Sequence, residues 1–370
     1  MAVKEIVRVL HVITDTNIGG AGKLVLALLS EKAAEAAVAL PKGSLLADEV
    51  RRLGVKCCEA EGIAEKSMSF RGISAVYDVI RDFCPDVVHA HASISARIAA
   101  KRYSFRKKCA VVSTRHSVFP VSRRKGSFPF KQINGLVNGF LSDVIIAVSP
   151  AAKQNLIDEG TSPEKIEVIF NGVSPPPVLN GEERADIRRR LGVNAEDFVC
   201  AVIARLEQPK GHEYIIEAAK MLPPEVKVII AGAGSLEDEI TSKIKDSGNI
   251  IFTGFVKKIE ELENIMDVQL NASVGTEATS LSLLEGMALG IPAVVSDFGG
   301  NPYVIENGQN GIVVPQRDPE KIAEAVLRLY GDKGEYQKMS QCAKRIFEEK
   351  FTVRAMCENT FRLYGRLTGK

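Results

Sequence analysis

The sequence predicts an α/β protein with two Rossmann-like, doubly wound parallel-sheet domains facing across a cleft. Short β-rich runs alternate with helical segments along the chain of 370 residues, and this alternation is typical of parallel sheets. Near residue 175 three consecutive prolines interrupt the alternation, which then starts again. The length also exceeds that of one ordinary core and fits two domains.

The strands are expected at apolar runs rich in β-branched residues, four on each side of the proline segment. In the first half these are IVRVLHVIT (6–14), DVVHAHA (86–92), CAVVSTRH (109–116) and DVIIAVS (143–149). In the second half they are FVCAVIARL (198–206), VKVIIAGAG (226–234), NIIFTGF (249–255) and IPAVVSD (291–297). Helical spacing is clearest at 24–34 and 74–83. The boundary therefore falls between a domain of residues 1–172 and one of residues 173–352, joined by a semi-rigid proline linker.

The composition excludes several classes of protein. Hydrophobic residues make up 45% and charged residues 25%, as in soluble globular proteins, so a disordered chain, a collagen-like fibre and a membrane bundle are ruled out. No apolar run is long enough for a membrane-spanning helix, and the N-terminus resembles a first strand rather than a signal peptide. Seven cysteines without a CxxC motif suit neither a disulfide framework nor a zinc site. We expect a cytoplasmic protein.

The charge is unevenly distributed along the chain. Residues 1–170 carry a net +7 and the remainder −5. No acid occurs between Asp86 and Asp143, a window that holds eleven bases: Arg97, Lys101, Arg102, Arg106, Lys107, Lys108, Arg115, Arg123, Arg124, Lys125 and Lys131. Phe119, Phe128 and Phe130 lie among them. This basic 97–131 region favours an anionic partner, such as a phosphorylated acceptor or an anionic membrane surface. The alternative is an ordinary solvated face, and the acidic second half argues against nucleic acid.

Two loops have the residues to bind phosphate. Gly19 and Gly20 follow the first strand and open a helix, where backbone N–H groups can approach an anion. As a dinucleotide motif this segment is weak, because it lacks the full GxGxxG order, and a tight turn is equally compatible with it. Arg205 and Lys210 follow the first strand of the second domain, and two cations at a strand's carboxyl end suit a diphosphate. The alternative for them is a surface loop with a helix cap.

Two glutamates flank a predicted helix start in the stretch 275–305. Glu277 precedes the helix that begins near Ser280, and Glu285 lies about one turn inside it. They do not share one helical face, so an acid/base pair of the glycosidase kind is not expected. The helix N-terminus can accept an anion, and the carboxylates can accept hydrogen bonds from sugar hydroxyls. In the alternative interpretation Glu277 is a near-cap residue and Glu285 a helix-surface acid.

The histidines allow a metal site but do not require one. His89 and His91 lie two residues apart on one strand and share a face. No third ligand is apparent in the sequence, so we expect no metal site. His11 is interpreted as a core residue, and His116 ends a strand. No Asp-x-Asp motif is present.

The combination of these motifs resembles glycosyltransferase family 4 (group 1), whose members are retaining enzymes of the GT-B fold. The resemblance is carried by Arg205…Lys210-Gly211, by Glu277-x7-Glu285 and by DFGGNPYVIENGQNGIVVP, and it covers nearly the whole chain. The C-terminal KFTVRAMCENTFRLYGRL resembles the helix that crosses back onto the first domain, at about 353–370. The chain departs from the family pattern at Thr279 and Ser280, where Phe-Gly is common.

The resemblance implies a role for each matching residue. Arg205 and Lys210 would hold the donor diphosphate, Glu285 the ribose, and Glu277 the hydroxyls of the transferred sugar. His91 and His116 would lie at the catalytic cleft. The remaining donor-binding positions would be Gly19, Gly20, Phe255, Val256, Ser280, Leu281, Ser282, Gly299, Gly300 and Asn301.

The expected function is therefore sugar transfer from a UDP- or GDP-sugar to a hydroxyl of a glycan or lipid-linked acceptor. Cell-envelope polysaccharide or lipopolysaccharide biosynthesis fits this acceptor, and so does peripheral contact with the cytoplasmic membrane face. No metal or other cofactor is expected. A nucleotide-sugar epimerase, a glycogen-synthase-like enzyme, a non-catalytic sugar-nucleotide-binding protein and, more weakly, a nicotinamide oxidoreductase remain open.

Overall fold

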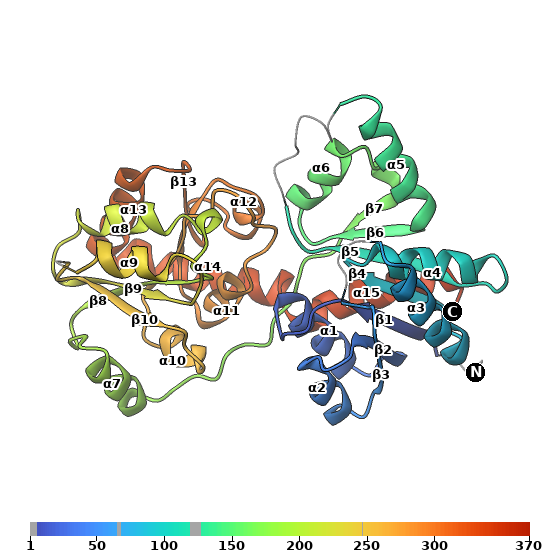
Figure 1. Ribbon diagram of the computed structural model, residues 1–370. Helices are drawn as coiled ribbons and strands as arrows, with labels where there is room; N and C mark the ends of the chain where they lie inside the picture. Colours follow the sequence, from blue (N-terminus) through green and yellow to red (C-terminus); the bar gives the residue numbers. More distant parts are fainter. Residues whose placement is uncertain (1–5, 65–67, 119–126, 246) are drawn as a thin grey trace. The chain divides into compact units, whose positions relative to one another are not determined.

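A computed structural model describes residues 6–64, 68–118, 127–245 and 247–370, and it divides into two compact units. Unit 1 comprises Met1–Val173 and Val353–Lys370, and unit 2 comprises Ser174–Thr352. The predicted boundary between residues 172 and 173 lies one residue before this division. The C-terminal segment thus belongs to the same unit as the N-terminus (Figure 1).

Unit 1 is built on a seven-stranded parallel sheet with the strand order β3-β2-β1-β4-β5-β6-β7. Its strands are β1 Arg8–Ile13, β2 Glu35–Pro41, β3 Lys56–Ala60, β4 Val87–His91, β5 Ala110–Arg115, β6 Val144–Ala147 and β7 Ile166–Val168. Its helices are α1 Gly20–Ser30, α2 Leu46–Arg52, α3 Phe70–Phe83, α4 Ile94–Ser104, α5 Phe130–Leu141, α6 Pro150–Asp158, the 3₁₀ turn η1 Pro163–Lys165, and α15 Val353–Thr368. Helix α15 packs against α1, where the Cys357 thiol lies 3.8 Å from the carbonyl oxygen of Ala27.

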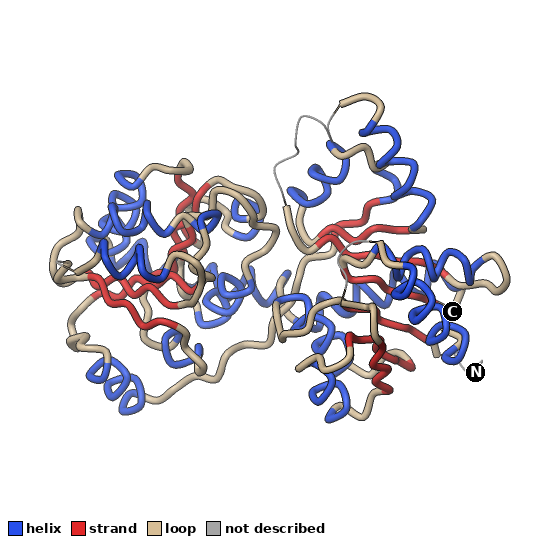
Figure 2. Tube along the Cα trace, viewed as in Figure 1, coloured by secondary structure: helices blue, strands red, loops and turns tan. Residues whose placement is uncertain are grey.

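Unit 2 is built on a six-stranded parallel sheet with the order β10-β9-β8-β11-β12-β13. Its strands are β8 Phe198–Ile203, β9 Val226–Ala231, β10 Ile250–Gly254, β11 Val268–Asn271, β12 Ala293–Ser296 and β13 Gly311–Val314. Its helices are α7 Gly181–Arg190, the 3₁₀ turn η2 Gln208–Lys210, α8 His212–Ala219, α9 Glu237–Lys243, α10 Ile259–Glu263, α11 Leu281–Leu289, α12 Asn301–Val304, α13 Pro319–Gly331 and α14 Lys333–Lys350. Figure 2 shows helices on both faces of each sheet.

Both sheets have a buried core on each face, which is what the near-continuous apolar strands require. In unit 2, for example, Val202 and Ile230 pack on one face while Val199 and Ile229 pack on the other. The strand order reverses once in each sheet, between β1 and β4 in unit 1 and between β8 and β11 in unit 2. Such a reversal opens a crevice at the carboxyl ends of the two strands, the usual place for a ligand in this architecture.

The predicted α/β class and all eight predicted strands are confirmed. The helix expected at 24–34 is wrong at its end: α1 stops at Ser30, because the chain turns at Lys32, where φ is +50°, into strand β2. Five strands were not predicted, namely β2, β3, β7, β11 and β13. They are short or, like the Glu35–Pro41 strand, rich in alanine, which has low β propensity. Among the helices described, none is both long and apolar enough to cross a membrane.

Candidate functional site

The crevice of unit 2 holds a buried ion pair. Lys210 lies in the loop after β8 and Glu277 in the loop after β11, so the strand reversal brings them together. The Lys210 Nζ lies 2.7 Å from Glu277 Oε2, and both side chains are largely excluded from solvent. A paired, hydrogen-bonded geometry is what allows two charges to stay ionised in a buried position.

The two oxygens of Glu277 differ in their surroundings. Oε2 accepts from Lys210 Nζ, from Asn271 Nδ2 at 3.3 Å and from Ser273 Oγ at 3.3 Å. No residue within the described ranges donates to Oε1. The carboxylate is therefore fixed through one oxygen, which leaves the other available to accept from a ligand hydroxyl.

A turn formed by Gly299 and Gly300 encloses the backbone of Glu277. The Gly300 N–H donates to the Glu277 carbonyl at 3.0 Å. Gly299 has φ +59°, and a Cβ at this position would lie 2.0 Å from the same carbonyl oxygen. Asn301, which follows, is buried and donates from Nδ2 to Ser296 Oγ at 3.3 Å. Only glycine fits at position 299, so the turn and the glutamate form one local structure.

Arg205 lies in the same loop as Lys210 but has a different environment. Its side chain is exposed, while its carbonyl oxygen lies 3.0 Å from Nε2 of the buried His212. Burial lowers the pKa of His212, so this imidazole is neutral and donates to the carbonyl. His212 therefore fixes the backbone of the loop and leaves the guanidinium of Arg205 facing solvent.

Helix α11 begins beside this loop. Its N-cap residue, Ser280, does not cap the backbone, and its hydroxyl lies 3.0 Å from the Ser282 hydroxyl instead. Ser282 in turn donates to the carbonyl of Ile203, the last residue of β8, at 3.3 Å. The N-terminus of α11 is thus held against the end of β8. Leu281, Ser282 and the half-buried Glu285 are all in its first turns.

The other predicted donor residues are found at loop positions. Phe255, which is exposed, and Val256, which packs in the core, follow β10. In unit 1, Gly19 and Gly20 are exposed and open α1, where Gly19 is the N-cap. The roles that we assign to these residues stay predictions.

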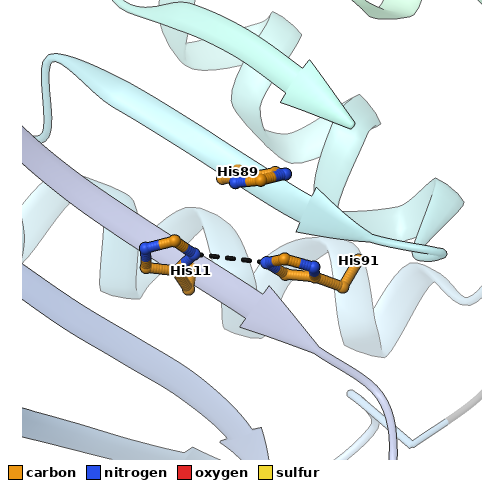
Figure 3. A group of neighbouring side chains, drawn as sticks. All are labelled: His11, His89 and His91. Carbon is orange, nitrogen blue, oxygen red and sulfur yellow. Dashed lines mark hydrogen bonds between the residues drawn. The ribbon is translucent and has the colours of Figure 1, made fainter. Parts of the chain in front are cut away.

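The crevice of unit 1 holds a chain of histidines instead of charges (Figure 3). His11 Nδ1 on β1 lies 3.2 Å from His91 Nε2 on β4, and His91 Nδ1 lies 3.1 Å from Nε2 of the half-buried His116. Burial lowers the pKa of His11 and of His116 to about 4, and the pKa of His91 well below its usual value. These imidazoles are therefore neutral near pH 7, and each link of the chain has one N–H donor and one acceptor.

His89 is fixed by two hydroxyl groups. Its Nδ1 lies 2.6 Å from the Tyr364 hydroxyl on α15, and its Nε2 lies 2.6 Å from Thr114 Oγ1 on β5. Its ring lies against that of His91, with centroids 4.2 Å apart. These contacts give His89 a structural role, and both His89 and His91 are buried.

The expectation that no third metal ligand accompanies His89 and His91 is wrong. The strand pairing puts His11 opposite His89, and ligand atoms of the three histidines lie within 4.8 Å of one another. Yet both nitrogens of His89 and both of His91 already have hydrogen-bond partners. A metal ion would have to replace these hydrogen bonds to reach the three histidines. The arrangement described fits a hydrogen-bonded chain better than a metal centre.

The basic 97–131 region is not one surface. Arg97 is directed inward, where Nε donates to Ser142 Oγ at 3.0 Å and Nη2 to Asn138 Oδ1 at 3.0 Å. Arg115 pairs with Glu159 at 3.0 Å. Arg102, Arg106, Lys107 and Lys108 are exposed around the end of α4. Phe119, Arg123, Arg124 and Lys125 lie outside the described residues.

Four residues of these sites were missed by the sequence analysis: Asn271, Ser273, Thr114 and Tyr364. The first three are polar residues at the carboxyl ends of β11 and β5, a signal that could have found them. Tyr364 could not be found in this way, because it is 275 residues from its partner His89 and meets it only through the packing of α15.

Two family models match the sequence of this chain. Residues 18–175 match the model of Glycosyltransferase Family 4, and residues 183–346 match that of Glycosyl transferases group 1. Together the two matches span most of the chain.

Individual relatives and solved structures share a third or less of their aligned residues with this chain in the three examples that follow. An uncharacterized glycosyltransferase of Methanocaldococcus jannaschii is 32% identical over 60% of this chain, a match that covers 59% of the relative and so less than two thirds of its length. The UDP-Gal:alpha-D-GlcNAc-diphosphoundecaprenol alpha-1,3-galactosyltransferase of Escherichia coli is 26% identical, over 71% of each chain. Among solved structures, Anabaena Alr3699/HepE in complex with UDP has a TM-score of 0.84 and 20% identity, over 97% of this chain and 100% of that one. This last likeness establishes the fold.

Proposed function

Because this chain belongs to the group 1 glycosyltransferases of the GT-B fold, we propose that it is a retaining, metal-independent enzyme that transfers a sugar from a UDP- or GDP-sugar to a hydroxyl acceptor. The observation that carries this proposal is the Lys210–Glu277 pair in the crevice between β8 and β11, next to the N-terminus of α11. Cations and a helix N-terminus suit a diphosphate, and a fixed carboxylate suits sugar hydroxyls.

In the proposed reaction the leaving group is a nucleoside diphosphate, and negative charge grows on its phosphate as the bond to the sugar breaks. Lys210, the exposed Arg205 and the N–H groups near Leu281 and Ser282 would face this charge, as an oxyanion hole does. The free Oε1 of Glu277 would accept from a hydroxyl of the transferred sugar, and Glu285 from the ribose. The Gly299–Asn301 turn would keep Glu277 in position.

Retention without a covalent intermediate fits the ion pairing of Glu277. This carboxylate is neutralised by Lys210, so a covalent sugar intermediate is not favoured on it. The proposed path is same-face attack, in which the departing phosphate takes the proton of the acceptor. Metal independence is proposed because Lys210 and Arg205 supply the positive charge that a divalent cation supplies in other transferases.

We further propose that the acceptor is lipid-linked or phosphorylated, as in cell-envelope polysaccharide or lipopolysaccharide assembly. The Escherichia coli relative is named for an acceptor carried on diphosphoundecaprenol, and another, 27% identical over 80% of this chain, for an O-antigen chain. The exposed cations around α4 of unit 1 suit an anionic acceptor or membrane surface. His91 and His116 are the residues of unit 1 that we expect to act on the acceptor side.

A nucleotide-sugar epimerase is the second candidate, since it would use the same donor crevice. It would release free sugar or an altered sugar nucleotide without any acceptor, and it would need cleft acids that exchange protons. The Glu277 carboxylate, already held by three donors at Oε2, is poorly suited to that task.

A thermal-shift screen followed by a transfer assay tests the proposal. UDP, GDP, ADP, their common sugar conjugates and NAD are each added with EDTA present. Stabilisation by one uridine or guanosine family, followed by nucleotide release that depends on an added acceptor, is the expected result. Stabilisation only by NAD, or release of an altered sugar without acceptor, would overturn it.

A further inference from the structure

Helix α5 of unit 1 has the reverse of the usual amphipathic arrangement. Of its twelve residues only Leu141 is buried. Its exposed apolar side chains follow helical spacing and share one side: Phe130, Ile133, Leu136, Val137 and Phe140, here called the α5 face. A surface helix of a soluble protein normally turns this side to the core. Leu136 is 74% exposed and Phe140 56% exposed.

The opposite side of α5 is fixed to the body of unit 1 by polar groups and by close backbone contact. Asn134 Nδ2 donates to the Glu159 carbonyl at 2.7 Å, and Asn138 Nδ2 donates to Thr161 Oγ1 at 3.1 Å. A Cβ on Gly135 would lie 2.0 Å from the carbonyl oxygen of Gly160, so the two backbones touch. The half-buried Arg97 also donates to Asn138 Oδ1. These contacts fix the orientation of α5. Its apolar side chains point outward because the opposite side of the helix is the one held against unit 1.

Cations border the α5 face. Phe105, 72% exposed, lies beside Phe140 with ring centroids 6.3 Å apart. The exposed Arg106, Lys107 and Lys108 follow it in the chain. Their side chains make surface contacts with the Tyr77 hydroxyl, the Cys84 thiol and the Thr368 carbonyl, respectively. The Lys101 ammonium lies 5.4 Å from the centre of the Phe140 ring and 3.8 Å from Asp143 Oδ1. Aromatic and aliphatic side chains next to Lys and Arg are the pattern of a helix that lies in the interface of an anionic membrane.

We propose that the α5 face, with Phe105 and the cations at 106–108, docks unit 1 onto an anionic lipid bilayer. A second copy of the chain is a poorer occupant, because a two-fold contact through this face would bring the basic border of one copy toward that of the other. A hollow of about 280 Å³ between Phe130, Ile133 and Val137 offers space for part of an acyl or prenyl chain. The Glu159 carboxylate also lines it, but its charge is matched by Arg115.

Docking on a membrane would bring unit 1 to a lipid-linked acceptor, so the purpose of this surface rests on the proposed function. The test of membrane binding itself needs neither donor nor acceptor. Sedimentation with vesicles of phosphatidylcholine and phosphatidylglycerol measures the bound fraction of the full chain. Leu136→Ser and Phe140→Ser should each weaken binding about tenfold, the effect of losing the burial of one large apolar side chain. Lys107→Gln should weaken it about fivefold, and only for anionic vesicles.

Phe70→Ser is the matched control, since Phe70 is 82% exposed at the start of α3 in the same unit but lies outside the α5 face. It should bind vesicles like the unaltered protein. The proposal is overturned by absence of binding, by equal binding to vesicles of phosphatidylcholine alone, by α5 variants that bind normally, or by a concentration-dependent dimer that Leu136→Ser disperses. Transfer to a soluble acceptor without vesicle binding would refute this surface alone, whereas vesicle binding without transfer would refute the proposed function.

Discussion

The two crevices of the molecule occupy equivalent places in their sheets but differ in chemistry. Each lies where the strand order reverses, between β1 and β4 in unit 1 and between β8 and β11 in unit 2. In unit 2 the reversal gathers a buried ion pair, Lys210 with Glu277. In unit 1 it gathers His11, His89 and His91, which burial keeps uncharged.

The difference shows how one architecture can serve two kinds of ligand. A buried charge must be matched, and in unit 2 the Glu277 carboxylate accepts from Lys210 and from two further donors, Asn271 and Ser273. A phosphate that binds here would share Lys210 with Glu277. Neutral imidazoles can instead donate or accept without a net charge, which suits hydroxyl groups. The proposed division of labour, with the diphosphate in unit 2 and the hydroxyl acceptor in unit 1, follows from this contrast.

The largest expected effect is the loss of the cation in unit 2. Lys210→Ala should raise the barrier to transfer by about 2–4 kcal/mol, a loss of roughly thirtyfold to a thousandfold in rate, because it removes positive charge that faces the leaving phosphate. Measurement of kcat/KM with saturating acceptor checks this value. The double variant Lys210→Met with Glu277→Gln is the control, since it leaves no unmatched buried charge. If it folded normally and transferred at the unaltered rate, the charged crevice would have no part in the reaction.

The second prediction concerns the turn around Glu277. Gly299→Ala should destabilise unit 2 by about 2–3 kcal/mol, because the new methyl group would meet the Glu277 carbonyl and because alanine is strained at this positive φ. Gly308→Ala separates the two causes, since Gly308 also has a positive φ, of +77°, but has no atom near its Cβ position. It should cost only about 1 kcal/mol. Equal losses in urea unfolding would show that the contact with Glu277 is unimportant.

The sequence predicted the fold better than it predicted these contacts. The long apolar strands and the proline linker are local features, so the eight strands and the two-unit division could be read from them. The Lys210–Glu277 pair was not predicted as a pair, because the two residues are 67 positions apart and meet only through the order of β8 and β11. His11 was assigned to the core and not to the histidine chain for the same reason: its neighbour is set by the pairing of β1 with β4.

The third prediction uses pH to test the neutral crevice. The pKa of His11 in the folded protein, about 4, lies below the value of roughly 6.5 expected when unfolded. The unfolded chain therefore binds more protons between these values, and the contribution to stability is complete above about pH 6.5 and lost as the pH falls toward 4. His11→Leu should reduce the slope of the unfolding free energy by about 1.4 kcal/mol per pH unit in this range. Chemical unfolding at pH 7 and pH 5 measures it, and an unchanged slope would mean that His11 is already charged or exposed.

The smallest expected effect concerns the hydrogen bond between Tyr364 and His89, whose ring packs against His91. Tyr364→Phe removes only the hydroxyl that lies 2.6 Å from Nδ1 of His89, which leaves a buried nitrogen without its partner. The loss should be about 1 kcal/mol in unfolding free energy. Tyr330→Phe in unit 2 is the matched control, because that ring is partly exposed, and it should change nothing. Since both variants leave the ion pair of unit 2 intact, nucleotide binding should be equal in the two. Weaker nucleotide binding by Tyr364→Phe would show that the crevice of unit 1 also contributes to donor binding. It would contradict the proposal that the diphosphate binds in unit 2 and the acceptor in unit 1.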